Sequence, residues 1–361
     1  LEQFSIPNDK SSHGGQSRII RKAYFEHPDY VPLLERAYHN WKHIEEKAGQ
    51  QLYFKTGLVY TGPADHTIIK GVKKAASLYN VDIENISQQE MGKRFPQIVI
   101  ESNSSTIFEP DAGFLLPGKA IDLYTKEAVK LGAVIHSNEK TLEWKKENGS
   151  IKVVTDKNVY TTKKLVVTAG AWMTQLLTDL PVQLNVTRQI LIWVKPKDPQ
   201  AYSLNNFPCW MIATEKLNGV YYGFPYLDAK IVGEPPGLKF AIHYPASKTD
   251  PDSVNREVSS DEIKDVINGV KEHLPAANSE VVASKVCLYT NTPDEDFIID
   301  HLPGYDSDVC FASACSGHGF KFASVIGEIL ADLTIDGATK LPVEFLRLKR
   351  FENQSAIGNE Q

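Results

Sequence analysis

The stretch Cys287-Leu-Tyr289-Thr-Asn-Thr-Pro293-Asp294-Glu-Asp-Phe297-Ile-Ile-Asp300 carries the most information about this chain. An isolated cysteine such as the one that opens it is usually a buried packing residue. A cysteine thiolate can also attack an electron-poor carbon when positive neighbours favour that form. A second stretch, Ser316-Gly317-His318-Gly319-Phe320-Lys321-Phe322, lies near the C-terminus. Its glycines allow close backbone approach, and an apolar pattern with helical spacing follows it.

Together these two stretches resemble the monomeric sarcosine oxidase and N-methyltryptophan oxidase family of FAD-dependent amine oxidases. The resemblance extends over nearly the whole chain. It implies an α/β fold, with a Rossmann-type FAD-binding domain and a substrate domain built on a mixed β-sheet. In the family the cysteine that matches Cys287 carries FAD through a thioether bond, so covalent FAD is expected at this residue.

The length of 361 residues favours two domains over a single core. Strand-like and helix-like segments alternate along the chain without an internal repeat, which indicates that both domains are discontinuous. The FAD-binding domain is expected over residues 1–50, 112–185 and 292–345, the substrate domain over 51–111 and 186–291, and a C-terminal tail over 346–361. The family places its active site where the two domains meet.

A dinucleotide-binding domain usually begins with a strand, a Gly-x-Gly-x-x-Gly turn and a helix that together hold the pyrophosphate. No such triplet occurs in this sequence. In the family an acidic residue ends the second strand and binds the ribose hydroxyls, and Glu2 fits that place. We therefore expect the first βαβ segment to be missing from the printed chain. A naturally shortened protein is the alternative.

Hydrophobic periodicity predicts the main elements. Helices are expected at 30–49, 119–131 and 260–273, and after the second stretch quoted above. Strands are expected at 52–54, 57–60, 134–136, 159–162, 190–194, 220–223 and 240–244. Residues 144–168 are expected to form a meander with a hairpin turn at Asn148-Gly149. The buried strand 165–167 should lead into a small-residue turn, Ala169-Gly170-Ala171-Trp172, which the family places beside FAD.

Two cations are expected to bind a substrate carboxylate, because the resemblance places Arg21 and Lys321 there. An arginine fork suits a planar carboxylate, and a lysine adds a point charge. Arg21 lies in Ser12-His13-Gly-Gly-Gln-Ser17-Arg18-Ile-Ile-Arg21, which closely follows a family string. In this string Gln16 stands where well-known members have Asp, and Ser17 keeps the hydroxyl of a Thr. A solvated basic surface is the alternative for the arginines.

Oxygen activation is expected to depend on Lys239. Alternation along the predicted strand puts Lys239 and His243 on one face. The family places this lysine beside the flavin and the histidine beside the substrate, and positive charge there would stabilise developing superoxide. Catalytic roles are expected for Lys239, His243, Arg18 and Tyr222. Substrate contacts are expected for Arg21, Lys321, Met211, Tyr222 and Tyr289.

FAD itself is expected to contact residues from both ends of the chain. They are Glu2, His13, Ser17, Arg18, Gly170, Trp172, Cys287, Gly317, His318, Gly319, Phe320 and Lys321. Without the resemblance, most of these would be interpreted as core residues, surface charges or an ordinary turn.

Bulk properties narrow the class of protein. A net charge of -6 argues against a dedicated nucleic-acid binder. No apolar run approaches the roughly 18 residues of a membrane span. The four cysteines show no metal spacing and are too few for a disulfide framework. We therefore expect no metal, no nucleic acid and no membrane association, and a cytoplasmic monomer.

The predicted function is FAD-dependent oxidation of a small secondary amino acid by O2, which yields H2O2. Sarcosine is the leading substrate, while N-methyltryptophan and pipecolate remain alternatives. An FAD dehydrogenase that uses another electron acceptor is a rival enzyme class. A catalytically silent binding protein on the same fold is the rival of a different class.

Overall fold

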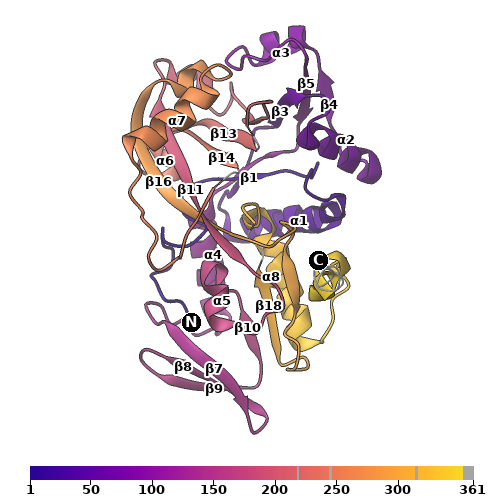
Figure 1. The fold of residues 1–361 in the computed structure, drawn as a ribbon, viewed down its shortest axis with the longest axis vertical. Helices are drawn as coiled ribbons and strands as arrows, with labels where there is room; N and C mark the ends of the chain where they lie inside the picture. Colours follow the sequence, from indigo (N-terminus) through magenta and orange to yellow (C-terminus); the bar gives the residue numbers. More distant parts are fainter. Residues whose placement is uncertain (218, 244–245, 314–315, 353–361) are drawn as a thin grey trace, which may run out of the picture.

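The computed structural model describes residues 1–217, 219–243, 246–313 and 316–352. In Figure 1 a large sheet with its covering helices occupies the upper part of the molecule. Helices α1, α4 and α8 lie in the middle, and a small three-stranded meander lies at the bottom. The long strands β11 (Asn185–Lys195) and β16 (Glu280–Asn291) pair along their whole length.

The large sheet has the strand order β15-β11-β14-β13-β12-β3-β5-β4, with β16 added against β11. Its other strands are β3 (Leu58–Pro63), β4 (Glu84–Ile86), β5 (Ser104–Glu109), β12 (Cys209–Ile212), β13 (Val220–Leu227), β14 (Gly237–His243) and β15 (Ser247–Lys248). Most neighbours are antiparallel, but β12 and β3 are parallel. The predicted mixed sheet is therefore confirmed.

Alternating side chains send the two faces of this sheet into different cores. Trp210 and Ile212 of β12 pack in the core that contains residues of α3 (Gln88–Arg94) and α7 (Ser260–Val270). Met211 points the other way, into the core that includes α2 (Thr67–Tyr79). This second face also carries Tyr222 and turns toward the rest of the molecule.

A second unit is built on the three-stranded sheet β10-β18-β17, in which β10 and β18 are parallel. Its strands are β10 (Leu165–Val167), β17 (Ile298–His301) and β18 (Val309–Ser313). Helices α1 (Val31–Ala48) and α8 (Ala323–Ile335) share one apolar core with β17 and β18. In the segment predicted as a tail, Leu348 and Phe351 are buried against a neighbouring core, while residues 353–361 lie outside the described part.

Two small sheets and three helices complete the fold. The sheet β1-β6-β2 is formed by β1 (Arg18–Ile20), β2 (Tyr53–Lys55) and β6 (Gly113–Leu115). The meander is formed by β7 (Thr141–Glu147), β8 (Ser150–Thr155) and β9 (Val159–Thr162). The helices are α4 (Pro117–Lys130), α5 (Met173–Leu176) and α6 (Ala229–Val232).

Most of the predicted elements are confirmed. Helix α1 ends where predicted, because Gly49 adopts the left-handed conformation at φ 64° and caps it. Helix α4 begins two residues before the predicted start, at a proline, and α7 ends three residues early. The hairpin turn at Asn148-Gly149 is present, with φ values of 49° and 76°. Residue 244 of the predicted strand 240–244 lies outside the described residues.

Two predictions for the smaller sheet are wrong. Residues 134–136 form no strand. Next to them lies one isolated parallel β-bridge, between Glu2 and Ser137. Strand β10 is not fully buried, because Val166 is 41% exposed. Both results have one physical reason: within the described chain β10 is an edge strand, and no strand lies between it and 134–136. Helices α2 and α3 have no counterpart among the predicted elements.

Candidate active site

One cavity of about 670 Å³ runs between the two units. Its lining comes from the N-terminal segment, the loop before β1, the turn after β10, the strands β11 and β16, and the start of α8. The predicted residues that line it are Glu2, His13, Arg18, Arg21, Gly170, Trp172, Met211, Tyr222, His243, Cys287, Tyr289, Gly317, His318, Gly319, Phe320 and Lys321. Two predicted residues, Ser17 and Lys239, are not part of this lining.

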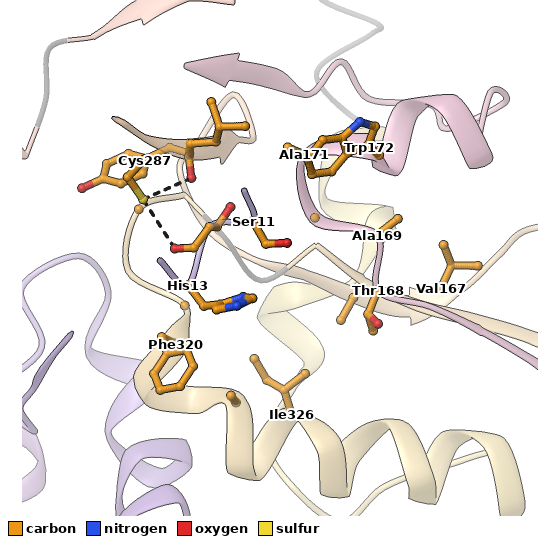
Figure 2. A pocket seen from close by; sticks show the side chains of 18 of the residues that line it. Ser11, His13, Val167, Thr168, Ala169, Ala171, Trp172, Cys287, Phe320 and Ile326 are labelled. Carbon is orange, nitrogen blue, oxygen red and sulfur yellow. Dashed lines mark hydrogen bonds between the residues drawn. The ribbon is translucent and has the colours of Figure 1, made fainter. Parts of the chain in front are cut away.

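Cys287 and the turn after β10 lie on different sides of the cavity, as Figure 2 shows. The turn contributes Ala169 and Trp172, and Ile326 of α8 lies below them in the same view. The sulfur of Cys287 lies 3.5 Å from the Ser12 carbonyl oxygen and 3.6 Å from Arg18 Nη2. Cys287 lines the cavity, forms no disulfide and is 5% exposed.

Arg18 and Lys239, which we call the loop cations, are both bonded to backbone carbonyl groups of the loop before β1. Arg18 donates to the carbonyl oxygens of Ser12, Gly14 and Ser17. Lys239 donates to Gly15 O and Ser17 O at 2.7 Å each. Burial and the nearby Arg18 charge lower the pKa of Lys239 well below its ordinary value. The loop cations thus fix this loop, with Lys239 behind it rather than at the cavity surface.

The loop has a shape that other residues could not easily keep. Gly15 adopts φ +95°, and a Cβ on it would lie 2.4 Å from Leu191 Cδ1. The neighbouring Gln16 accepts from Trp193 Nε1 at 2.8 Å and donates to Pro235 O at 3.1 Å. The amide therefore ties the loop to the large sheet, and a carboxylate at this position could not donate to Pro235 O.

Arg21 and Lys321, which we call the clamp cations, have different surroundings. Arg21 Nη2 contacts both carboxylate oxygens of Glu26, at 2.5 Å and 2.7 Å. Its guanidinium lies between two rings, 4.1 Å from the Tyr24 centroid and 4.2 Å from the Phe25 centroid. Arg21 Nη1 is buried and has no hydrogen-bond partner within the described part of the chain. One edge of the guanidinium is therefore available to a ligand.

A single carboxylate, that of Glu26, compensates one of the two clamp cations. Burial alone would raise the pKa of Glu26, but the charge of Arg21 and the hydrogen bond from Arg21 lower it to about 2. Lys321 donates to His318 O at 2.7 Å, and burial together with Arg21 lowers its pKa well below the ordinary value. At pH 7 an ionised Glu26 compensates Arg21, so a further anion would be matched by Lys321.

Aromatic side chains wall the space beside the clamp cations. His243 Nδ1 lies 3.3 Å from the Tyr289 hydroxyl, and Tyr222 packs edge-on to the His243 ring. Burial lowers the pKa of His243 to about 4, so this ring is neutral at pH 7. A Cβ on Gly317 would lie 2.3 Å from the Tyr289 ring, which is why the loop before α8 has a glycine here. Tyr222, His243 and Tyr289 therefore form a shared wall of the cavity.

The residues around the rest of the cavity fit a bound FAD. Gly170 adopts φ +54°, and nothing lies within 4 Å of a Cβ placed on it, so the turn after β10 is open. The Ser12 hydroxyl is buried at the cavity and finds no hydrogen-bond partner among the described residues. Burial and then Arg18 lower the pKa of His13 to about 4, which leaves the ring neutral. A long cavity with spare polar groups and an open small-residue turn suits a dinucleotide.

Three residues around Arg21 had no prediction: Glu26, which is partly buried, and Tyr24 and Glu109, which are fully buried. Glu109 accepts from the backbone N–H groups of Lys22 and Ala23 and from the Tyr60 hydroxyl. It thereby fixes the chain directly after Arg21. Glu26 and Tyr24 follow Arg21 so closely in sequence that their proximity could have been inferred. No sequence signal connects Glu109 with this turn.

Comparison with known proteins identifies the cofactor. Residues 1–333 match the family described as FAD dependent oxidoreductase, DAO. The chain belongs to this family. One relative, a monomeric sarcosine oxidase of Streptomyces avermitilis, is 34% identical to this chain over 95% of this chain and 88% of its own length. A peroxisomal sarcosine oxidase of Homo sapiens is 32% identical over 97% and 89%. An N-methyl-L-tryptophan oxidase of Yersinia pestis is 30% identical over 97% and 92%.

Solved structures show the same fold for this FAD-dependent oxidoreductase. NikD, an unusual amino acid oxidase, superimposes with a TM-score of 0.83 at 19% identity, over 96% of this chain and 90% of its own. An L-proline dehydrogenase from P. horikoshii gives 0.79 at 22% identity, over 93% and 86%. The predicted α/β flavoenzyme fold and the predicted family are confirmed. Within the described ranges, no helix could cross a membrane and no cluster of three or more potential ligands could hold a metal.

Proposed function

We propose that this flavoenzyme oxidises a small secondary amino acid, with sarcosine as the leading substrate and O2 as the electron acceptor. The observation that carries the proposal is the position of the clamp cations. Arg21 and Lys321 line the same cavity as Cys287, and Arg21 Nη1 has no hydrogen-bond partner among the described residues. A planar carboxylate is the ligand that an arginine edge and a lysine bind together.

The chemistry divides between cofactor and chain. FAD, when bound, supplies the acceptor for two electrons and passes them to O2. The clamp cations hold the carboxylate and so orient the amine within the compartment of Tyr222, His243 and Tyr289. Positive charge around the site and a neutral His243 disfavour the ammonium form of the substrate. The amine is therefore held neutral, the form that can lose a hydride equivalent.

The overall reaction balances without a further co-reactant. Sarcosine loses two electrons and two protons to give an imine, and water hydrolyses the imine to glycine and formaldehyde. O2 takes up the two electrons and two protons as H2O2. This assignment requires no side-chain nucleophile and no metal.

The choice among secondary amino acids depends on the aromatic wall beside the clamp cations. The aromatic wall beside the clamp cations favours sarcosine over the larger N-methyltryptophan, while pipecolate needs space only for a ring. The relatives include oxidases named for sarcosine and for N-methyl-L-tryptophan. An amine panel with a peroxide readout, run on the FAD-loaded protein, tests the assignment. We expect sarcosine to have the highest kcat/KM, and peroxide-free turnover with an artificial acceptor would favour the dehydrogenase instead.

We also propose that FAD is attached through a thioether at Cys287. Cys287 lines the cavity and forms no disulfide, and its sulfur lies beside Arg18, a fixed cation. Acid precipitation of the FAD-loaded protein should leave the yellow colour in the pellet. In Cys287→Ser the colour should move to the supernatant, whereas Cys209→Ser, a buried cysteine outside the cavity, should behave as the wild type. Free FAD from the wild type would contradict the bond. A cytoplasmic location and a monomeric state stay predictions.

A further inference from the structure

Tyr24 is a fully buried residue that contacts both clamp cations without lining the cavity itself. The face of its ring lies 4.1 Å from the guanidinium carbon of Arg21. Its hydroxyl lies 3.4 Å from Lys321 Nζ and 2.5 Å from His318 Nδ1. One side chain thus joins an arginine, a lysine and a histidine that belong to segments almost 300 residues apart.

The direction of each hydrogen bond follows from the chemistry of its partner. His318 Nε2 lies 3.1 Å from the Glu295 carbonyl oxygen, which can only accept, so Nε2 carries the hydrogen. Burial lowers the pKa of His318 to about 3, so the ring is neutral and Nδ1 accepts. The Tyr24 hydroxyl must then donate to His318. Its oxygen is left to accept from Lys321.

This arrangement leaves Lys321 with a defined direction for a ligand. A protonated lysine has three N–H donors. One donates to His318 O at 2.7 Å and another to the Tyr24 oxygen, so the third remains for a group in the cavity. The Tyr24 oxygen also favours the protonated lysine, against the burial and the Arg21 charge that lower its pKa.

The aromatic core of the second unit holds this arrangement in place. The His318 ring stacks on Phe297 with centroids 4.6 Å apart. Tyr24 packs against Tyr30 and Phe322 at 5.0 Å and 5.3 Å. Rings packed this closely cannot change rotamer without opening a cavity, so the hydroxyl stays aimed at Lys321.

We propose that Tyr24 is a positioning residue of the carboxylate site, which orients Arg21 with its ring and Lys321 with a hydroxyl whose direction His318 fixes. The proposal rests on the proposed function, because it assigns a role in binding the substrate carboxylate. It predicts that loss of the hydroxyl weakens carboxylate binding while the protein stays folded.

The test compares Tyr24→Phe with Tyr30→Phe in the FAD-loaded protein. Tyr30 belongs to the same ring cluster, but its hydroxyl bonds to the Phe297 backbone N–H rather than to a cation. Acetate binding is followed by the flavin absorbance spectrum, sarcosine turnover by KM and kcat, and folding by thermal unfolding. A hydrogen bond to a charged group contributes roughly 1.5–3 kcal/mol, so the acetate Kd and the sarcosine KM should rise about tenfold or more in Tyr24→Phe. Tyr30→Phe should stay within about twofold of the wild type in both quantities, since its hydroxyl contacts the Phe297 N–H and the Asp296 carboxylate but neither clamp cation.

Two further variants connect the effect to its partners. In a Lys321→Met background, Tyr24→Phe should weaken acetate binding no further, and a full additional loss would overturn the Lys321 part of the proposal. His318→Phe keeps the stack on Phe297 but removes the acceptor, and should weaken binding less than Tyr24→Phe.

Equal binding by wild type and Tyr24→Phe, or an equal loss in Tyr30→Phe, would overturn the positioning role alone. A wild-type protein that responds neither to acetate nor to sarcosine would overturn the proposed function, and this proposal with it.

Discussion

Arg18 and Lys239 are bonded to backbone carbonyl groups, whereas Arg21 is bonded to the carboxylate of Glu26. All of these cations are buried or nearly so, but the two kinds of partner have different consequences. Carbonyl dipoles satisfy N–H donors without cancelling a formal charge, so the loop cations leave a positive field at the flavin side. A carboxylate cancels the charge it binds, so Glu26 compensates Arg21 and leaves Lys321 to be matched by an incoming anion.

This difference separates the roles of the two groups. A field that stays positive suits a step in which negative charge develops on oxygen. A compensated arginine with one free guanidinium edge, together with a lysine, suits reversible binding of a carboxylate. Variants of each group should therefore damage different half-reactions, and the three predictions below test that separation.

Replacing a clamp cation should have the largest effect. Arg21→Met removes the planar fork and leaves Glu26 without its partner. Truncating one member of a buried charge pair costs roughly 2–5 kcal/mol. The sarcosine KM should therefore increase by a factor between about tens and thousands. Steady-state kinetics on the FAD-loaded variant measures this.

Arg36→Met is the matched control, because Arg36 makes a two-pronged contact with Glu328 outside the cavity. Its KM should be unchanged. An unchanged KM in Arg21→Met would discard Arg21 as the carboxylate ligand.

Glu26 should give the next largest effect, and its sign depends on pH. Its folded-state pKa of about 2 lies below the ordinary value of 4.5. The ionised form thus stabilises the fold above pH 4.5, by about 3 kcal/mol, and this contribution is lost as pH falls toward 2. The stability advantage of wild type over Glu26→Gln should shrink between pH 6 and pH 3, as measured by urea unfolding.

Glu109 provides a control of opposite sign. Burial raises its pKa above the ordinary value, so its ionised form costs stability at neutral pH. The free energy of unfolding of the wild type should therefore rise relative to that of Glu109→Gln as the pH falls through the same range. Parallel profiles for the two variants would show that Glu26 and Arg21 are not coupled as the geometry indicates.

Acetate should also bind more tightly to Glu26→Gln, since Arg21 loses its internal anion.

Replacing a loop cation should affect the reaction with oxygen. Losing one preorganised charge-stabilising group costs about a hundredfold or more in rate, so Lys239→Met should slow the return of electrons to O2 by that factor. Anaerobic reduction by sarcosine should suffer much less, because the clamp cations are intact. Stopped-flow absorbance follows the two half-reactions separately.

Lys164→Met is the control, since Lys164 also donates to a carbonyl oxygen, that of Ser307, but away from the cavity. A Lys239→Met protein that reacts with O2 at the wild-type rate would remove the main physical support for an oxidase. If Lys239→Met changed only the sarcosine KM, Lys239 would have a role in substrate binding instead of oxygen activation.

The outline of the fold could be predicted from local signals. Helix α1 has an apolar stripe and a glycine stop, and the β7–β8 hairpin has an Asn-Gly turn, so both depend on neighbouring residues only. The strand expected at 134–136 failed because a strand needs a partner. Pairing is a property of the assembled sheet, and the described chain provides only the bridge from Glu2 to Ser137.

The sequence by itself determined which residues are candidates for the chemistry: a cysteine in a string that resembles the family's attachment site, two arginines three residues apart, a lysine on a strand and a lysine after a glycine turn. Only the tertiary structure decided what those residues contact. It placed Lys239 behind the loop rather than in the cavity, gave Arg21 the carboxylate of Glu26, and brought Tyr24 to Lys321 across almost 300 residues of chain. The physical reason is that charge and donor number belong to a side chain, whereas burial and hydrogen-bond partners are fixed only when distant segments pack together.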